Sequence, residues 1–399
     1  MYRPQRHAII MLKEQQAYCG RQGVPGRGQY ETGFRYDQAG VRAVQLPLSI
    51  LFLRRCCIAA RSKKLWRYDG RDYKSRAAKP VCDLSDGDTL AVAFQGGEPT
   101  LAGLGYFTEF ARLAKQLRPG VRVSYALQTN GSQLDEAWCR FLKQHHFLVG
   151  LSLDGYAEAH NRYRVDENGA GTYAQVLHAK KLLENAGVEY NVLCTLTNEL
   201  ARHPQKIWNT LLQLKIKYVQ FTPCLGRLEE GQQDEWALTP QRFAAFYQSI
   251  FALWKAEVEK GNYISVKLFD DIVNLLLRHE VTACGLHGYC QLQYIVEADG
   301  GAYPCDFYVL DRYYGGNLAR QPLHEITQQL QNTNFLQSRA ELPAPCAGCR
   351  YLALCHGGCK RLQQAMYVDD DGYCGYRQLL DAIGQPLCDI GSRLLAGAL

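Results

Sequence analysis

The sequence lacks long hydrophobic runs, a large excess of charge of one sign, internal repeats and low-complexity segments. A membrane-spanning helix needs about 18 consecutive apolar residues, so the run LPLSILFL at residues 46–53 is too short. That run also starts too far from Met1 for the apolar core of a signal peptide. The formal charge is only +6, and the basic residues gather before Pro80. We therefore expect neither a membrane protein nor a nucleic-acid-binding protein.

Cysteine, in contrast, is abundant, with 16 residues among 399. Without a membrane segment or signal peptide, the sequence predicts a cytoplasmic location, where thiols stay reduced. Disulfides then do not explain the cysteines, and metal binding is the default interpretation. A hydrophobic content of 47% and a charged content of 21% are typical of a soluble globular protein with two or three domains.

Strands and helices alternate from residue 89 onward. The expected strands are TLAVAFQGG, VRVSYALQTNG, FLVGLSLDG, VEYNVLCTLT and KYVQFTPCLG, all short apolar runs. Helical spacing lies between them in YFTEFARLAKQL, LDEAWCRFLKQH and TYAQVLHAKKLLENAG, the last closed by Gly187. This alternation predicts an α/β fold with a parallel sheet, closed into a barrel or partial barrel. Two further amphipathic stretches, residues 238–261 and 266–280, are expected to be helical.

Polar residues gather where the expected strands end. The four segments are residues 95–100, 128–131, 152–155 and 223–225. In parallel α/β barrels the loops after the strands build the active site, so we expect these segments to converge on one pocket. Each segment alone could be turn chemistry, because Gly and Asn tolerate positive φ.

The C-terminal part is rich in cysteine, and we place a domain boundary near Val281. Eight cysteines lie within about 90 residues, at positions Cys284, Cys290, Cys305, Cys346, Cys349, Cys355, Cys359 and Cys374. Eight thiolates complete two four-ligand sites, which hold either iron–sulfur clusters or structural zinc. Cys139, Cys194, Cys224 and Cys388 stand singly and are expected to be small core residues. Asp306 directly follows Cys305 and is either a general base or an ordinary hydrogen-bonded carboxylate.

Several motifs together resemble one enzyme family. They are FQGGEPTLAG, QTNG, GLSLDG, HNRYRVDENGAGTY, YVQFTPCL, EADGGAYPCDFYVLD and CAGCRYLALCHGGCKR. The sequence resembles the anaerobic sulfatase-maturating enzymes, which are radical S-adenosylmethionine (SAM) enzymes with a C-terminal SPASM domain. The resemblance covers residues 89–376, and YPCDFYVLD is its most specific motif. It implies a partial (β/α)6 radical SAM barrel followed by a cysteine-rich auxiliary cluster domain.

The resemblance also implies roles for individual residues. Gly97 and Glu98 would meet the methionine end of SAM, and Ser152, Arg164 and Leu225 would complete its pocket. One auxiliary 4Fe-4S cluster would be held by Cys284, Cys290, Cys305 and Cys359, and the other by Cys346, Cys349, Cys355 and Cys374. Asp306 becomes the candidate catalytic base.

The implied reaction converts a Cys or Ser of a sulfatase, within a CxPxR or SxPxR segment, to formylglycine under anaerobic conditions. A deoxyadenosyl radical would abstract a hydrogen from the substrate β-carbon, Asp306 would take the side-chain proton, and an auxiliary cluster would accept an electron. The partners implied are the sulfatase polypeptide and an electron donor such as flavodoxin or ferredoxin.

One element of the family is missing from the sequence. Members carry CxxxCxxC for the cluster that reduces SAM, and this motif occurs nowhere here; the early cysteines Cys19, Cys56, Cys57 and Cys82 lack its spacing. Residues 34–72, written with permitted codons and read one base later, can encode a segment containing CNYHCPYCFYAD. The three cysteines arise at Val44, Leu48 and Leu51. Our hypothesis is a frameshift before about residue 30, reversed near residues 74–88.

The expected domains are therefore residues 1–85, an aberrant region replacing the first barrel strand and cluster loop; residues 86–280, the partial barrel; and residues 281–399, the auxiliary cluster domain. We expect a barrel that lacks its first strand and exposes an edge, and a chain that does not cleave SAM as translated. The alternatives are another SPASM enzyme that modifies peptides, for example by thioether crosslinks, and a non-catalytic metal-binding remnant.

Overall fold

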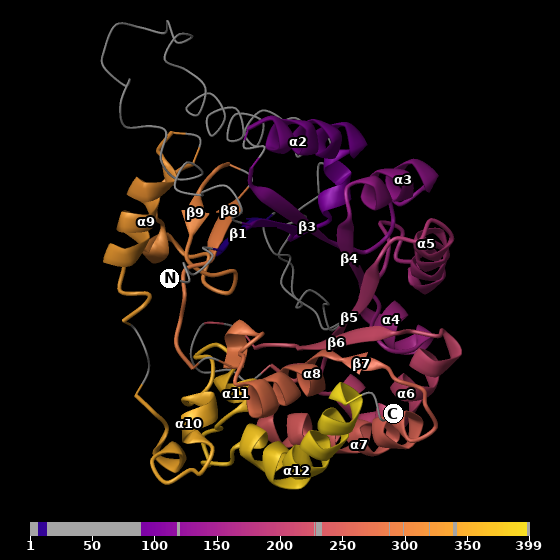
Figure 1. Cartoon of the computed structure of the whole chain (residues 1–399), viewed down its shortest axis with the longest axis vertical. Helices are drawn as coiled ribbons and strands as arrows, with labels where there is room; N and C mark the ends of the chain where they lie inside the picture. The colour runs from indigo at the N-terminus through magenta and orange to yellow at the C-terminus, as the bar shows by residue number, and fades with distance from the viewer. Residues whose placement is uncertain are drawn as a thin grey trace, which may run out of the picture.

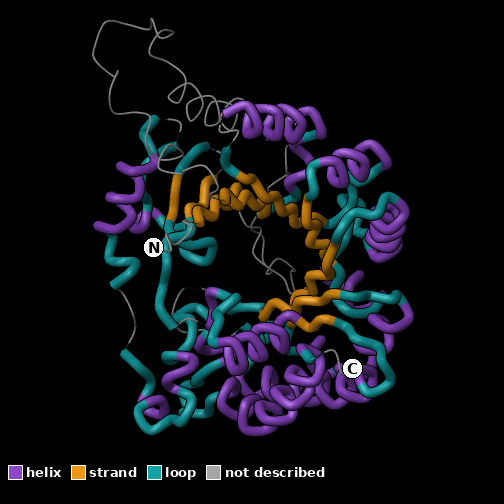
Figure 2. The backbone as a smooth tube through the Cα atoms, in the orientation of Figure 1, coloured by secondary structure: helices purple, strands orange, loops and turns teal. Residues whose placement is uncertain are grey.

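A parallel sheet curves around the centre of the molecule, with helices on its outer face (Figures 1 and 2). The computed structural model describes residues 7–13, 89–117, 120–226, 228, 234–286, 288–297, 299–318, 320–337 and 341–396. Within these ranges the sheet has nine strands in the order β7-β6-β5-β4-β3-β2-β1-β8-β9. Every neighbouring pair is parallel except the β8–β9 hairpin.

The strands are short, and most lie at the predicted positions. They are β1 (His7–Lys13), β2 (Thr89–Gln95), β3 (Arg122–Thr129), β4 (Phe147–Ser152), β5 (Tyr190–Leu196), β6 (Tyr218–Pro223), β7 (Ser265–Val266), β8 (Tyr294–Glu297) and β9 (Ala302–Tyr303). Leu127, Val149 and Leu196 are fully buried. Buried parallel strands read as continuous apolar runs, which is why β2 to β6 could be located from sequence.

The helices between these strands cover the outer face of the sheet (Figure 2). They are α2 (Leu104–Leu117), α3 (Glu136–Gln144), α4 (Ala157–Tyr163), α5 (Tyr173–Asn185) and α6 (Pro204–Gln213). Gly187 has φ of 63°, the left-handed conformation expected just beyond the end of α5. The predicted partial barrel followed by a cysteine-rich domain is confirmed.

The edge of β2 is not exposed, and the expectation of a missing first strand is wrong in this respect. β1 pairs with β2 over its whole length, from His7 opposite Thr89 to Lys13 opposite Gln95. The segment HAIIMLK supplies an apolar extended run that hydrogen-bonds to β2 on one side and to β8 on the other. The rest of residues 1–85, including the segment 34–72 on which the frameshift hypothesis rests, lies outside the described residues.

The C-terminal part adds a second set of helices. They are α7 (Pro240–Val258), α8 (Lys267–Val273), α9 (Leu323–Asn332), α10 (Leu352–Cys355), α11 (Gln363–Met366) and α12 (Gly375–Leu395). The stretch predicted as one helix at 266–280 is shorter, because α8 passes into a π-helical turn at Asn274–Arg278. α12 packs on α7, and one apolar core runs from Leu90 in β2 to Ile390 in α12. The two halves therefore share a core.

Candidate active site and auxiliary cluster pockets

Glu98 ties the ends of two neighbouring strands together. Its buried carboxylate accepts hydrogen bonds from Thr100 N at 3.1 Å and Thr100 Oγ1 at 2.5 Å, both just beyond β2. From the end of β3 it accepts from Thr129 Oγ1 at 2.7 Å and Asn130 N at 2.6 Å. The preceding Gly97 has φ of 51°, which lets the chain turn sharply. The Glu98 carboxylate therefore organises the loops, while its expected contact with SAM stays a prediction.

Arg164 and Asp154 form an ion pair at the end of β4. The guanidinium donates from Nε to Asp154 Oδ2 at 2.5 Å and from Nη2 to Oδ1 at 3.3 Å. Nη2 also lies 3.4 Å from Thr195 Oγ1 in β5, and Asp154 Oδ1 accepts from Thr195 N at 2.7 Å. A two-point contact fixes the plane of a guanidinium as well as its position.

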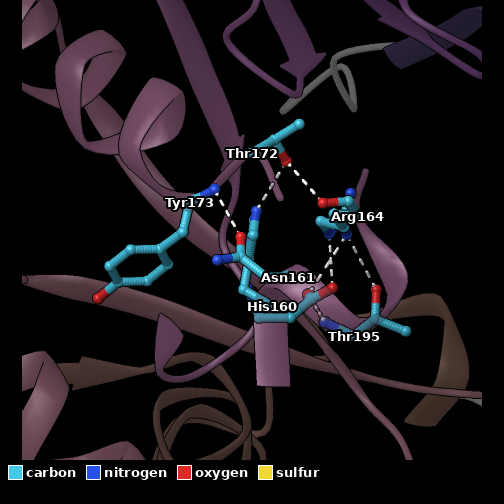
Figure 3. Close-up of polar contacts among 7 residues, drawn as sticks. His160, Asn161, Arg164, Thr172, Tyr173 and Thr195 are labelled. Carbon is cyan, nitrogen blue, oxygen red and sulfur yellow. Dashed lines mark hydrogen bonds and ion pairs between the residues drawn. The ribbon is translucent and has the colours of Figure 1, made fainter. Parts of the chain in front are cut away.

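His160 completes a closed set of contacts around this ion pair (Figure 3). Its Nδ1 accepts from Asp154 N at 3.2 Å, and its Nε2 lies 3.1 Å from Thr172 Oγ1. The Thr172 hydroxyl donates to Arg164 O at 3.0 Å. We call Asp154, His160, Arg164 and Thr172 the polar ring. The single Thr172 proton goes to Arg164, so Nε2 of His160 must carry the hydrogen that Thr172 accepts.

The polar ring keeps its histidine neutral. His160 is fully buried, and burial followed by the charge of Arg164 lowers its pKa from 6.5 to about 4. Thr172 directly precedes α5 as its N-cap residue, yet its side chain makes no capping hydrogen bond to that helix. Its hydroxyl serves the polar ring instead. Near neutral pH, His160 therefore adds no second positive charge beside the Arg164 guanidinium.

The segment after β6 is tied to both halves of the chain. Cys224 N donates to Leu196 O at 3.0 Å, and Leu225 packs against the apolar core. The next residue, Gly226, accepts a hydrogen bond through its carbonyl from Arg361, which lies two residues beyond Cys359. Contacts thus join segments 95–100 and 128–131 to each other, and segments 152–155 and 223–225 each to the end of β5. The convergence of the four segments on one pocket stays a prediction. Ser152 lies at the end of β4, as expected.

The first cysteine pocket collects one expected set of four thiols. Cys346, Cys349, Cys355 and Cys374 line a pocket of about 400 Å³, counting the open space at its mouth. Burial raises the pKa of Cys355, and the neighbouring Cys346 and Cys349 raise it further. Burial likewise raises the pKa of Cys374, with contributions from Cys355 and Cys349. The structure brings together the four cysteines that the resemblance grouped.

The second cysteine pocket is wider and more open. Cys284, Cys290 and Cys359 line a pocket of about 650 Å³, measured in the same way. Cys305 lies beside them. Burial makes the largest contribution to raising its pKa, and the charge of Asp306 and the neighbouring Cys359 and Cys284 raise it further. Its Sγ is 3.6 Å from Asp306 Oδ1. The other expected set of four is therefore also gathered, with Asp306 at its side.

The donor sets fit iron–sulfur clusters. Thiolates gathered in fours raise one another's pKa, and the positive iron of a cluster offsets that repulsion. No group of three or more His, Cys, Asp or Glu within the described ranges is arranged to hold a single metal ion. Of the isolated cysteines, Cys139, Cys194 and Cys224 are buried core residues as expected, whereas Cys388 in α12 is only half-buried.

Three members of the polar ring were not singled out from sequence. The motif HNRYR drew attention to Arg164 but not to His160, four residues earlier on α4. Likewise GLSLDG yielded Ser152 but not Asp154. The spacing of four between His160 and Arg164, one helical turn, was a usable signal. Thr172 could not be placed, because the loop between the bridged residues Val165 and Gly171 brings it back to Arg164.

The partial parallel barrel, the strand-end polar groups and the two thiol pockets define a radical SAM enzyme with an iron–sulfur SPASM domain. A family model described as an iron–sulfur cluster-binding domain, SPASM, matches residues 286–350. The chain belongs to the anaerobic sulfatase-maturating enzyme family. A cysteine-type member from Clostridium perfringens is 35% identical over 322 residues, which cover 79% of this chain and 87% of that protein.

Other comparisons agree with this family. A serine-type anaerobic sulfatase-maturating enzyme from Bacteroides thetaiotaomicron is 26% identical over 299 residues, covering 71% of this chain and 72% of the relative. The solved structure of native anSMEcpe with bound AdoMet and Cp18Cys peptide matches with a TM-score of 0.77 and 28% identity. That match covers 98% of this chain and 100% of the other. No helix among the described residues is long and apolar enough to cross a membrane.

Proposed function

We propose that this chain derives from a maturase that oxidises a cysteine of a sulfatase to formylglycine. The observation that carries the proposal is the gathering of eight cysteines into two sets of four, with Asp306 beside Cys305. Cysteine is favoured over serine because the cysteine-type relatives are 34–37% identical and the serine-type relatives 26–30%. The cytoplasm is the proposed location, and flavodoxin or ferredoxin the proposed electron donor.

We assign the binding of SAM to the strand ends. Arg164, oriented by Asp154 and Thr195, suits the carboxylate of the methionine moiety, since a guanidinium pairs with carboxylates at two points. Gly97, Ser152 and Leu225 would form the rest of the pocket, with Glu98 holding the loops of β2 and β3 in place. SAM supplies the radical chemistry of this enzyme class, and the protein supplies position and exclusion of water.

Asp306 is the proposed base for the substrate thiol. Its carboxylate lies next to Cys305, at the edge of the second cysteine pocket. A base must lie within hydrogen-bonding reach of the proton that it takes, so the substrate side chain would bind beside this pocket. The auxiliary clusters, when bound, supply one-electron transfer.

The chain as translated does not fit the third cluster of the family. It contains no CxxxCxxC, so we derive no reaction step through that cluster. We propose that the frame-corrected chain is active and that this chain is not.

Anaerobic reconstitution of both chains tests the proposal. With iron and sulfide quantified, this chain should hold two clusters and the corrected chain three. Only the corrected chain should then form formylglycine in a CxPxR peptide, and the SxPxR peptide should react more slowly. Asp306→Asn in the corrected chain should keep all three clusters and lose formylglycine. A colourless, zinc-filled protein contradicts the proposal, and a thioether product favours the alternative SPASM activity.

A further inference from the structure

The first cysteine pocket holds a buried hydroxyl that has no partner in the protein. Tyr376 lines the pocket together with its four cysteines, and only 1% of the residue is exposed. Its hydroxyl is buried and has no hydrogen-bond partner among the described residues. Leaving a buried hydroxyl unpaired costs about 1–3 kcal/mol, so such a group ordinarily meets an acceptor.

Packing fixes the position of Tyr376. It is the second residue of α12, directly after Gly375 and two residues after Cys374. A Cβ on Gly375 would lie 2.3 Å from Pro240 O at the start of α7, so the helix begins in tight contact with α7. The Tyr376 ring also packs on the ring of Tyr367 with 5.3 Å between centroids. The hydroxyl cannot easily turn away from the pocket.

A second tyrosine of the same pocket provides a contrast. Tyr367 is as deeply buried as Tyr376 and also lines the first cysteine pocket. Its hydroxyl, however, donates to Gly285 O at 2.9 Å. Tyr367 is therefore satisfied by the protein itself, and the two rings differ mainly in where their hydroxyl protons go.

We propose that the Tyr376 hydroxyl donates a hydrogen bond to a sulfur of the auxiliary cluster in the first cysteine pocket and thereby raises the reduction potential of that cluster. The inference rests on the proposed function, because it requires a cluster held by Cys346, Cys349, Cys355 and Cys374. A tyrosine hydroxyl is protonated near neutral pH, since its ordinary pKa is about 10. Cluster sulfurs are acceptors only, and their negative charge grows on reduction. A donated hydrogen bond therefore stabilises the reduced state more.

The test is a redox titration of the full chain reconstituted under argon, followed by electron paramagnetic resonance. With no CxxxCxxC motif, the chain gives two auxiliary midpoints without the signal of a third cluster. In Tyr376→Phe, one midpoint should move to a more negative potential and the other stay. In the matched control Tyr367→Phe, both midpoints should stay at the parent values, although the variant loses its hydrogen bond to Gly285.

A second measurement on the parent keeps the test decisive if Tyr376→Phe binds its cluster poorly. Electron–nuclear double resonance in H2O and D2O should reveal an exchangeable proton coupled to one reduced cluster. The proposal is overturned if the parent lacks that proton, if Tyr376→Phe keeps it along with both parent midpoints, or if Tyr367→Phe shifts a midpoint as far as Tyr376→Phe does. Absence of iron from the reconstituted parent would instead overturn the proposed function, and the inference with it.

Discussion

In the barrel, each member of the polar ring pairs with a protein group of opposite charge or with a matching hydrogen-bond donor or acceptor. In the auxiliary domain, by contrast, cysteine thiols lie next to other cysteine thiols. Arg164 pairs with Asp154, and His160 lies between a donor and an acceptor. In the first cysteine pocket, by contrast, burial raises the pKa of both Cys355 and Cys374, and the neighbouring Cys349 raises both further. The polar ring is therefore satisfied by protein groups alone, whereas the cysteine pockets require a metal cluster.

The difference indicates how each half depends on its cofactor. A preorganised site binds a ligand without rearranging and folds equally well without it. Clustered thiolates repel one another unless metal is bound, so the free energy of metal binding contributes directly to the stability of the fold. The two halves nevertheless share a core, and α12 packs on α7. Loss of a cluster should therefore weaken the auxiliary domain first and the barrel only through this contact.

The largest expected effect is the loss of a whole cluster from one pocket. Cys355→Ala should remove the cluster of the first pocket and Cys359→Ala that of the second, each lowering bound iron from about eight to about four atoms per chain. Iron and sulfide analysis after anaerobic reconstitution provides the measurement. Cys388→Ala, at a half-buried position of α12 outside both sets of four, should keep all the iron. Equal loss from all three variants would contradict the assignment of the two sets of four.

The ion pair of the polar ring gives the next largest effect. Asp154→Asn should lower the free energy of unfolding by about 3 kcal/mol, because it leaves the partly buried guanidinium of Arg164 without its anion. Urea unfolding under argon measures this. The matched control is the Arg162–Glu199 pair, whose side chains are 57% and 49% exposed; Glu199→Gln should cost less than about 1 kcal/mol. If both variants lowered the free energy of unfolding by a similar amount, the burial of the Asp154–Arg164 pair would not increase its contribution to stability.

The stability of the barrel should depend on pH, because His160 is neutral in the folded protein. His160 has a pKa of about 4 in the folded protein against 6.5 ordinarily, so between these values the unfolded chain binds a proton that the folded chain does not. Its contribution to stability is therefore full above pH 6.5 and falls as the pH drops toward 4, by about 2 kcal/mol at pH 5. The measurement is the difference in free energy of unfolding between the parent and His160→Gln across this range. A difference that does not change with pH would contradict a neutral buried His160.

Strands and helices could be predicted from the sequence where their hydrophobic pattern lies within the element itself. The strands β2 to β6 and the helices α2, α3 and α5 could be predicted, because continuous apolar runs and helical spacing reflect burial on one or both faces. The grouping of the cysteines came from the family resemblance, because spacing alone does not say which thiols meet in space. Cys374 reaches Cys355 only after a turn that the bridge between Val368 and Cys374 closes.

Features built from distant segments could not be predicted in this way. β8 pairs with β1 across more than half the chain, so the auxiliary hairpin extends the barrel sheet. Nothing within either segment specifies its partner, since both are short apolar strands. The polar ring is similar: it joins β4, α4 and the start of α5 through single hydrogen bonds. The absence of CxxxCxxC, in contrast, could be read directly from the sequence, because that motif is local.

The smallest expected effect comes from a local contact of the barrel that belongs to neither the ring nor the pockets. Asp135 caps α3, its carboxylate accepting from Trp138 N at 2.8 Å. Asp135→Ala should lower the free energy of unfolding by about 1 kcal/mol, and Asp135→Ser should restore most of that loss, because a serine hydroxyl caps a helix as well. Bound iron and the pH dependence due to His160 should both stay at the parent values. If iron fell with Asp135→Ala, any weakening of the barrel would reach the cysteine pockets, and the two halves would not differ in their dependence on metal.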